Sequence, residues 1–324
     1  MKNYRTLALA GAIFASLTVP VMAQVEGWQY EWPNTDFTKT SVDFNSIMSG
    51  GPPKDGIPAI DDPTFISVAD ENRIADNEPV MTLELEGKIP RAYPIRYLTW
   101  HEIVNDVIDG RNVTITFCPL CNSALVFEGK LNGKILTFGV SGKLRNSDMI
   151  MYDRQTESWW QQAIGEGIVG DHTGDQLTQI VSWMESWGEY KARNPNALVM
   201  DEPKANRPYG SNPYAGYDSS ARPFLYSGEL PPFGIPPLMR VVKVGNKAWP
   251  MDRLQKVEEL TEGGVTITWK SGQASALDTR QISKGKNVGT IRVRDANGKD
   301  LPHDVMFAFA FQAFYPNGDW MTGK

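Results

Sequence analysis

The chain has few of the residues from which metal centres and disulfide frameworks are built. It contains 2 Cys and 3 His among 324 residues, which excludes a disulfide-rich scaffold and any metal site that needs four cysteines. Its Lys and Arg are scattered, and its formal net charge is −6. Proteins that bind nucleic acids usually present a basic stripe to the phosphates, so we expect no nucleic-acid partner.

The composition is otherwise that of a folded globular protein. Hydrophobic residues make up 41% of the chain, charged residues make up 22%, and there are 10 Trp. Such a chain has enough apolar surface to bury a core. The sequence offers no Ser-His-Asp order, no glycine-rich phosphate loop and no His-Glu-x-x-His helix, so hydrolase, nucleotide and metalloprotease chemistries have no support.

The first 23 residues have the organisation of an export signal. Lys2 and Arg5 precede an apolar run from Leu7 to Pro20, and Val21 and Ala23 stand where a signal peptidase reads small residues. We predict cleavage after Ala23, a periplasmic or secreted location and no membrane span after signal removal. An uncleaved anchor is the alternative. The mature chain would hold 30 Lys and Arg against 38 Asp and Glu, and its thiols would face an oxidising compartment.

Two stretches of the chain form a degenerate internal repeat. The segment 92–98 resembles 248–254 at an offset of 156, and 113–117 resembles 265–269 at an offset of 152. Both copies have the pattern of a strand, a turn, an aromatic-Pro strand, a short helix and a β-branched strand. Chance similarity between ordinary strand patterns is the alternative. We therefore predict a mostly β (α+β) fold of two related β-rich units, with short helices and long ordered loops.

This repeat divides the chain into predicted segments. They are the export signal 1–23, an N-terminal wrapping segment 24–63, a first β-rich unit 64–195 with the cysteine motif, a Pro/Gly/Tyr-rich strap 196–236, and a second β-rich unit 237–324 without the motif. We also expect helices at 100–109 and 182–193. Large and small residues alternate from Phe307 to Phe314, which predicts a strand.

The motif Cys118-Pro119-Leu120-Cys121 carries the most chemical information. It follows the predicted strand 113–117 and precedes the strand-like segment 124–127. A thioredoxin motif would instead open a helix, so we predict a knuckle between two strands, with both sulfurs on one side. This geometry suits either a metal ion or a reversible disulfide.

The second copy of the repeat supplies an internal comparison. Lys270 and Gln273 stand where the first copy has Cys118 and Cys121, and His101 also has no counterpart there. Because the scaffold persists without these residues, we predict a site formed by Cys118, Cys121 and His101. The alternative is a structural disulfide with an unrelated histidine. We expect His172 and His303 to lie at the surface.

A second polar and aromatic cluster follows at 146–162. Met149 and Met151 alternate as on a strand, and their thioethers are soft ligands that could complete the cysteine site. Trp159 and Gln162 are candidates for its walls. The alternative is a polar hairpin with buried Met and Trp.

Several motifs together resemble a known family. These are Trp100-His101-Glu102-Ile103-Val104-Asn105-Asp106, the segment around Cys118-Pro119-Leu120-Cys121-Asn122, Phe138-Gly139-Val140-Ser141-Gly142, and Met151-Tyr152-Asp153-Arg154-Gln155-Thr156. They resemble the bacterial and archaeal family known as domain of unknown function 3179, across nearly the whole mature chain. The resemblance implies that His101, Cys118 and Cys121 carry the family pattern, and it implies no reaction.

Three functional hypotheses follow from these residues. The first is a soft-metal site for copper(I), or for zinc as the second choice, with a periplasmic protein or metal donor as partner. The second is a thiol–disulfide oxidoreductase or redox sensor that uses Cys118 and Cys121. The third is a disulfide-clipped binding module without catalytic activity.

Overall fold

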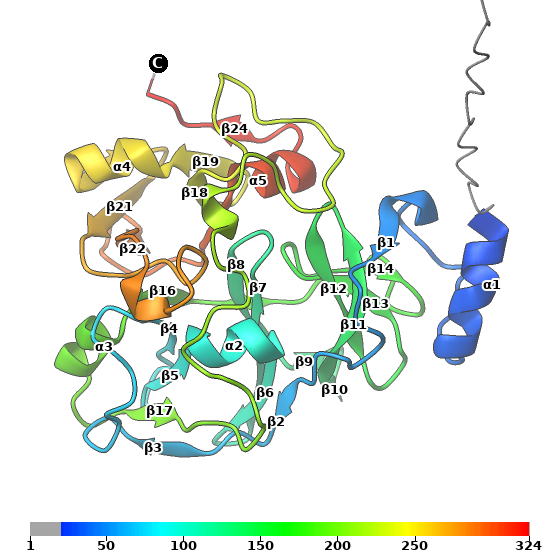
Figure 1. Cartoon of the computed structure of the whole chain (residues 1–324), viewed down its shortest axis with the longest axis horizontal. Coiled ribbons are helices and arrows are strands. Elements are labelled where there is room, and N and C mark those ends of the chain that lie inside the picture. Colours follow the sequence, from blue (N-terminus) through cyan, green and yellow to red (C-terminus); the bar gives the residue numbers. More distant parts are fainter. Residues whose placement is uncertain (1–20, 324) are drawn as a thin grey trace, which may run out of the picture.

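The structure, a computed structural model, describes residues 21–323. It is a five-bladed β-propeller, in which strands hold 36% of the residues and helices hold 15% (Figure 1). Within the described range, no helix has both the length and the apolar character needed to cross a membrane. Residues 1–20 of the expected export signal lie outside this range, so the signal and its cleavage remain predictions.

Two five-stranded sheets contain the residues of the predicted site. The first has the order β15-β8-β7-β6-β2, formed by Gln179–Ile180, Ser123–Glu128, Arg111–Cys118, Ile103–Ile108 and Ile60–Asp61. The second has the order β1-β11-β12-β13-β14, formed by Ile47–Ser49, Phe138–Arg145, Asp148–Asp153, Trp159–Gln161 and Glu166–Val169. All the neighbouring strands are antiparallel except β2 and β6, which are parallel.

Three further sheets complete the blades. One has the order β16-β4-β5-β17-β3, formed by Ser182–Ser186, Pro79–Leu83, Arg91–Pro94, Leu198–Met200 and Phe65–Ser67. Another has the order β23-β18-β19-β24, formed by Asp304–Phe307, Arg240–Val244, Lys247–Pro250 and Asp319–Trp320. The last has the order β20-β21-β22, formed by Glu259–Glu262, Val265–Lys270 and Thr290–Arg294. Strands β9 and β10, Lys130–Leu131 and Lys134–Ile135, form a separate ribbon.

The helices are short and connect the strands. The α-helices are α1 Val21–Glu31, α2 Ile95–His101, α3 Trp187–Arg193, α4 Met251–Val257 and α5 Ala308–Phe314. Single 3-10 turns are formed by η1 Phe44–Ser46, η2 Tyr217–Ser219 and η3 Ile282–Lys284. The largest hydrophobic core contains Cys118, Cys121 and Met149 together with Phe307 and Phe309 of the C-terminal region.

The predicted mostly β (α+β) fold of two repeat units is wrong, because the strands assemble into five blades. The repeated segments do form similar local elements, and both α2 and α4 start after a proline and end at a glutamate with a φ near 60°. Each copy, however, supplies strands to two different sheets. The sheet of β1 and β11–β14 has no counterpart in the repeat. A repeated local pattern specifies its own hairpins but not the number of sheets that assemble.

Two predicted elements have the wrong type or bounds. The helix expected at 100–109 is instead the end of α2 followed by strand β6, which begins at Ile103. Its β-branched residues favour a strand. The strand expected at 307–314 is mainly helix α5, whose first four residues, Ala308 to Phe311, are all buried, so burial here does not follow the alternation that suggested a strand. The helix expected at 182–193 begins only at Trp187, after strand β16.

Candidate functional site

Cys118 and Cys121 lie in a tight connection between two antiparallel strands. Cys118 is the last residue of β7, and it pairs with Ser123, the first residue of β8. The turn closes through Asn122, whose φ of 55° is in the left-handed region that Asn tolerates better than most residues. The predicted knuckle between strands is thereby confirmed.

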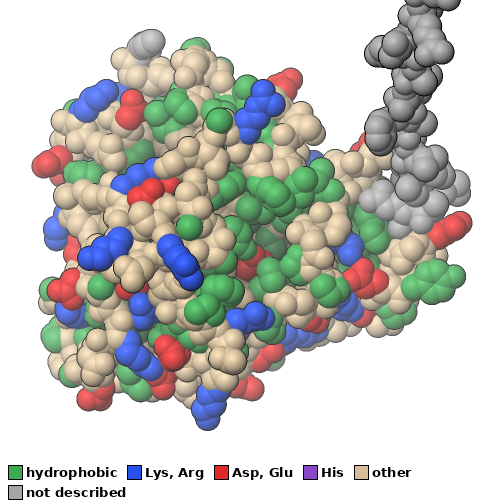
Figure 2. Space-filling view, viewed as in Figure 1, with side chains coloured by type: hydrophobic (Ala, Val, Ile, Leu, Met, Phe, Trp, Pro, Cys, Tyr) green, Lys and Arg blue, Asp and Glu red, His purple; other side chains and the backbone are tan. Residues whose placement is uncertain are grey.

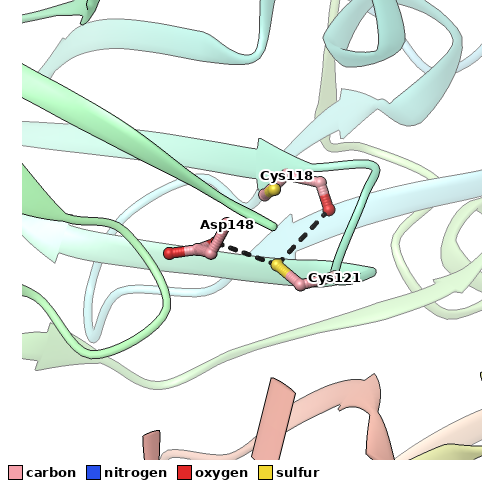
Figure 3. A group of neighbouring side chains, drawn as sticks. All are labelled: Cys118, Cys121 and Asp148. Atoms are coloured by element: carbon pink, nitrogen blue, oxygen red, sulfur yellow. Dashed lines mark hydrogen bonds between the residues drawn. The ribbon is translucent and has the colours of Figure 1, made fainter. Parts of the chain in front are cut away.

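Asp148 joins the two cysteines from the neighbouring sheet. It is the first residue of β12 and follows a turn in which Asn146 and Ser147 have φ values of 51° and 58°. One carboxylate oxygen of Asp148 and the two Sγ atoms all lie within 4.8 Å of one another. Figure 3 shows the Asp148 side chain beside Cys121, whose thiol donates to Asp148 Oδ1 at 2.9 Å.

The surrounding backbone and side chains fix the orientation of these donor atoms. Gln161 Nε2 and the main-chain N–H of Ala163 donate to Asp148 Oδ2 at 2.6 Å and 3.0 Å. The main-chain N–H of Met149 points to Cys118 Sγ at 3.4 Å. Asp148 Oδ2 is thus held by the protein, whereas Oδ1 faces the thiols.

All three side chains are removed from solvent, with exposed fractions of 1% for Cys118 and 0% for Cys121 and Asp148. Burial raises the pKa of each group, and that of Cys121 is raised well above its ordinary value. The loss of hydration disfavours the charged forms, and the mutual proximity of the acids adds to this effect for the thiols. Both thiols are therefore protonated at neutral pH when no cation is bound.

The structure places His101 outside this group. His101 is the last residue of α2, and its Nδ1 and Nε2 atoms lie 2.7 Å from Pro58 O and 2.6 Å from Tyr209 Oη. Burial lowers the pKa of its imidazole. Both ring nitrogens are thus engaged in linking the N-terminal segment, helix α2 and the 196–236 loop. No contact places them beside the cysteines.

The remaining candidates for the site are packed or hydrogen-bonded inside the protein. Met149 and Met151 are buried, and Met149 also lines a cavity beside the knuckle. Gln162 donates to Thr116 Oγ1 at 2.8 Å, and Trp159 packs against aromatic rings of the N-terminal segment.

The expectation that His172 and His303 lie at the surface is wrong. Their exposed fractions are 8% and 4%. The Nδ1 atom of His172 lies 2.8 Å from Asp175 Oδ2, and that of His303 lies 2.8 Å from Leu301 O.

Comparison of the sequence with models of protein families finds a match. The model of a family described as protein of unknown function (DUF3179) matches residues 54–318. The chain belongs to this family. The match includes Cys118, Cys121 and Asp148, and it confirms the resemblance found in the sequence. No curated protein and no solved structure was found to match the chain. Because the description of the DUF3179 family names no reaction, the function has to be argued from the site.

Proposed function

We propose that the protein binds one metal ion through Cys118 Sγ, Cys121 Sγ and Asp148 Oδ1. The observation that carries this proposal is the convergence of these three donor atoms within 4.8 Å. Residues 21–323 contain no other such group of His, Cys, Asp and Glu donors.

The burial of three acidic groups explains why the site would favour a cation. Two thiols and a carboxyl group lie where water cannot hydrate their charged forms. A metal ion would provide the missing positive charge and release the thiol protons, since the thiolate is the form that binds metals. Metal affinity would therefore rise with pH.

The donor set favours zinc(II) over copper(I). Zinc accepts thiolate sulfur together with carboxylate oxygen, whereas copper(I) prefers soft sulfur ligands alone. The contacts from Gln161 and Ala163 to Asp148 Oδ2 would act as the outer shell that orients the carboxylate. Copper(I) could be held by the two thiolates alone, which would leave Asp148 Oδ1 without a role, and Met149 is joined to Cys118 Sγ through its main-chain N–H rather than its thioether.

A second candidate function uses the two cysteines as a redox pair, which the closeness of the Sγ atoms favours. Both cysteines are free thiols in the structure. Their raised pKa values oppose this function, because a catalytic dithiol needs an accessible thiolate with a lowered pKa. We also propose that the protein is periplasmic and that it receives its metal from a donor protein. Both statements belong to the metal proposal.

Elemental analysis of the anaerobically purified protein tests the metal proposal. We expect about one zinc per chain, and we expect cobalt(II) to replace it with a visible spectrum that reports thiolate coordination. In competition with a chelator, Cys118→Ser and Asp148→Asn should lose more than the ~10–100-fold in affinity that is typical of outer-shell changes. His101→Gln serves as a control that keeps the affinity.

Two outcomes would reject the metal proposal. One is equal metal uptake by the wild type and Cys118→Ser. The other is a chain without metal whose thiols cycle near the potentials of catalytic dithiols, on the order of −120 to −270 mV. The second outcome would establish the redox alternative.

A further inference from the structure

A cavity of about 440 Å³ lies beside the cysteine knuckle. Leu120 and Met149, which adjoin Cys121 and Asp148 in the chain, form part of its wall. Figure 2 shows hydrophobic side chains gathered around a hollow on this face of the molecule. The remaining apolar lining includes Ile57, Val140, Leu144 and Phe224.

Glu102 is the one acidic side chain in this mainly apolar lining, and it is only 7% exposed. Tyr214 Oη donates to Glu102 Oε1 at 3.3 Å. Within residues 21–323, Glu102 Oε2 has no hydrogen-bond partner. Burial raises the pKa of Glu102 to about 8, so its carboxyl group is mostly protonated at neutral pH.

The repeated element separates the backbone role of this residue from the role of its side chain. Glu102 and Glu258 end α2 and α4 with φ values of 59° and 60°. Their carbonyl oxygens accept from Phe117 N and Trp269 N at 2.8 Å and 2.7 Å. The Glu258 side chain is exposed, whereas the Glu102 side chain is buried at the cavity. The shared backbone geometry therefore does not explain why Glu102 points inward.

The cavity offers no uncompensated charge to a ligand. Its lining contains one cationic side chain, Lys143, whose Nζ is paired with Glu31 Oε2 at 2.6 Å. A protonated Glu102 would add a hydrogen-bond donor without a charge. An ionic ligand would thus lose hydration without gaining a free counter-charge.

We propose that this cavity binds a small, uncharged and mainly apolar molecule whose carbonyl oxygen accepts a hydrogen bond from Glu102. The apolar wall would bury the body of the ligand, and Glu102 Oε2 would orient its oxygen. This inference uses none of the three metal donors as a ligand contact, and burial is the largest cause of the raised Glu102 pKa, to which the charge of Asp148 adds a smaller part.

Binding of four benzene derivatives of similar size tests this proposal. They are acetophenone, ethylbenzene, phenyltrimethylammonium and benzoate, measured on the full chain at pH 6.5 by ligand-observed NMR and calorimetry. We expect acetophenone to bind about tenfold more tightly than ethylbenzene, the difference that one hydrogen bond typically provides. The two ions should bind more weakly than acetophenone.

Variants show whether Glu102 provides this preference. Glu102→Leu should abolish the difference between acetophenone and ethylbenzene, whereas Glu102→Gln should keep it because the amide still donates. Glu258→Leu is the matched control and should behave as the wild type. If Glu102→Leu does not fold, Ala215→Trp at the exposed rim should block acetophenone binding in a folded chain.

Three results would overturn the proposal. The first is a preference for phenyltrimethylammonium or benzoate, which would assign the cavity to charged ligands. The second is an unchanged acetophenone preference in Glu102→Leu or unchanged binding in Ala215→Trp. The third is the absence of saturable binding for all four probes.

Discussion

The main-chain N–H of Phe307 donates to the carbonyl oxygen of Cys121 at 2.8 Å. The same strand, β23, also holds the residues that follow Cys121. Asp304 Oδ2 accepts from Ser123 Oγ at 2.6 Å, and Val305 O accepts from Asn122 Nδ2 at 2.7 Å. The knuckle is therefore positioned by a strand from the C-terminal part of the chain, although that part lacks the cysteines.

We predict that Asn122→Ala destabilises the protein more than Asn122→Gly. Both variants lose the hydrogen bond to Val305, which costs about 1–3 kcal/mol when a buried partner is left unpaired. Ala also opposes the positive φ of 55°, which Gly adopts freely, and this adds roughly 1 kcal/mol. Urea unfolding followed by tryptophan fluorescence measures both effects. Equal midpoints would show that the left-handed turn does not constrain this position.

The position of the thiol site was predictable from the sequence, but its third member was not. The knuckle follows from local signals, namely a β-branched strand, a Pro-containing turn and a second strand. Asp148 reaches the cysteines only because β12 belongs to the adjacent sheet. The sequence drew attention to 146–162, but it favoured Met149 and Met151 as ligands, since no spacing rule links Asp148 to the cysteines.

The misassigned elements have a similar cause. The strand after Glu102 and the helix after Phe307 both depend on contacts with other sheets, and their local patterns were compatible with either element type. The number of blades is also a property of the assembled sheets, so an internal repeat of hairpins does not predict it.

His101→Ala should weaken folding without changing the metal content. The imidazole joins Pro58 and Tyr209 through two short contacts, and its removal leaves both partners unpaired. We expect a loss of about 1–3 kcal/mol in the free energy of unfolding. Chelator competition on the folded variant should give the wild-type metal affinity. A large loss of metal affinity would show that His101 is a metal ligand.

The pH dependence of His101 provides a separate test. Burial lowers its pKa in the folded state below the ordinary value of 6.5. At pH values around and below 6.5, the unfolded chain therefore takes up a proton that the folded chain does not. The His101 contribution is complete above this range and is lost as the pH falls. His101→Gln should show a smaller loss of stability than the wild type between pH 7 and pH 5, as measured by urea unfolding, and parallel profiles would contradict this role.

Phe309→Ala should be among the most destabilising substitutions in the chain. Phe309 is fully buried in α5, and its ring lies 4.9 Å from that of Tyr226. Removal of a buried Phe leaves a cavity and costs roughly 3–5 kcal/mol, which is comparable with much of a domain's net stability. We expect aggregation or a strongly lowered unfolding midpoint. A stable, soluble variant would contradict the assigned packing.

Two positions in the second copy of the repeat serve as controls for Phe309→Ala. Lys270 is 68% exposed and pairs with Glu189 at 2.8 Å, so Lys270→Ala should be nearly neutral. Gln273 is only 5% exposed, and its side chain lies 3.5 Å from Thr290 Oγ1. Gln273→Ala should therefore cost about 1 kcal/mol. Neither variant should change metal binding.

Glu102→Gln should make the protein more stable than the wild type at alkaline pH. Burial raises the Glu102 pKa to about 8 in the folded protein, against 4.5 as its ordinary value. Between these values the unfolded chain releases a proton that the folded chain retains, so stability falls as the pH rises. This loss has a slope of at most about 1.4 kcal/mol per pH unit and is complete above pH 8. A glutamine has no such proton to lose.

The matched control for this prediction is Glu258→Gln, which changes the same residue type at the same helix end. Its side chain is exposed, so its substitution should leave the pH profile of the wild type unchanged. Urea unfolding of the three proteins from pH 5 to pH 9 provides the comparison. The stability of Glu102→Gln relative to the wild type should increase from pH 5 to about pH 8 and then level off. If that difference is constant, Glu102 is already ionised in the folded protein and cannot donate the hydrogen bond that the cavity proposal requires.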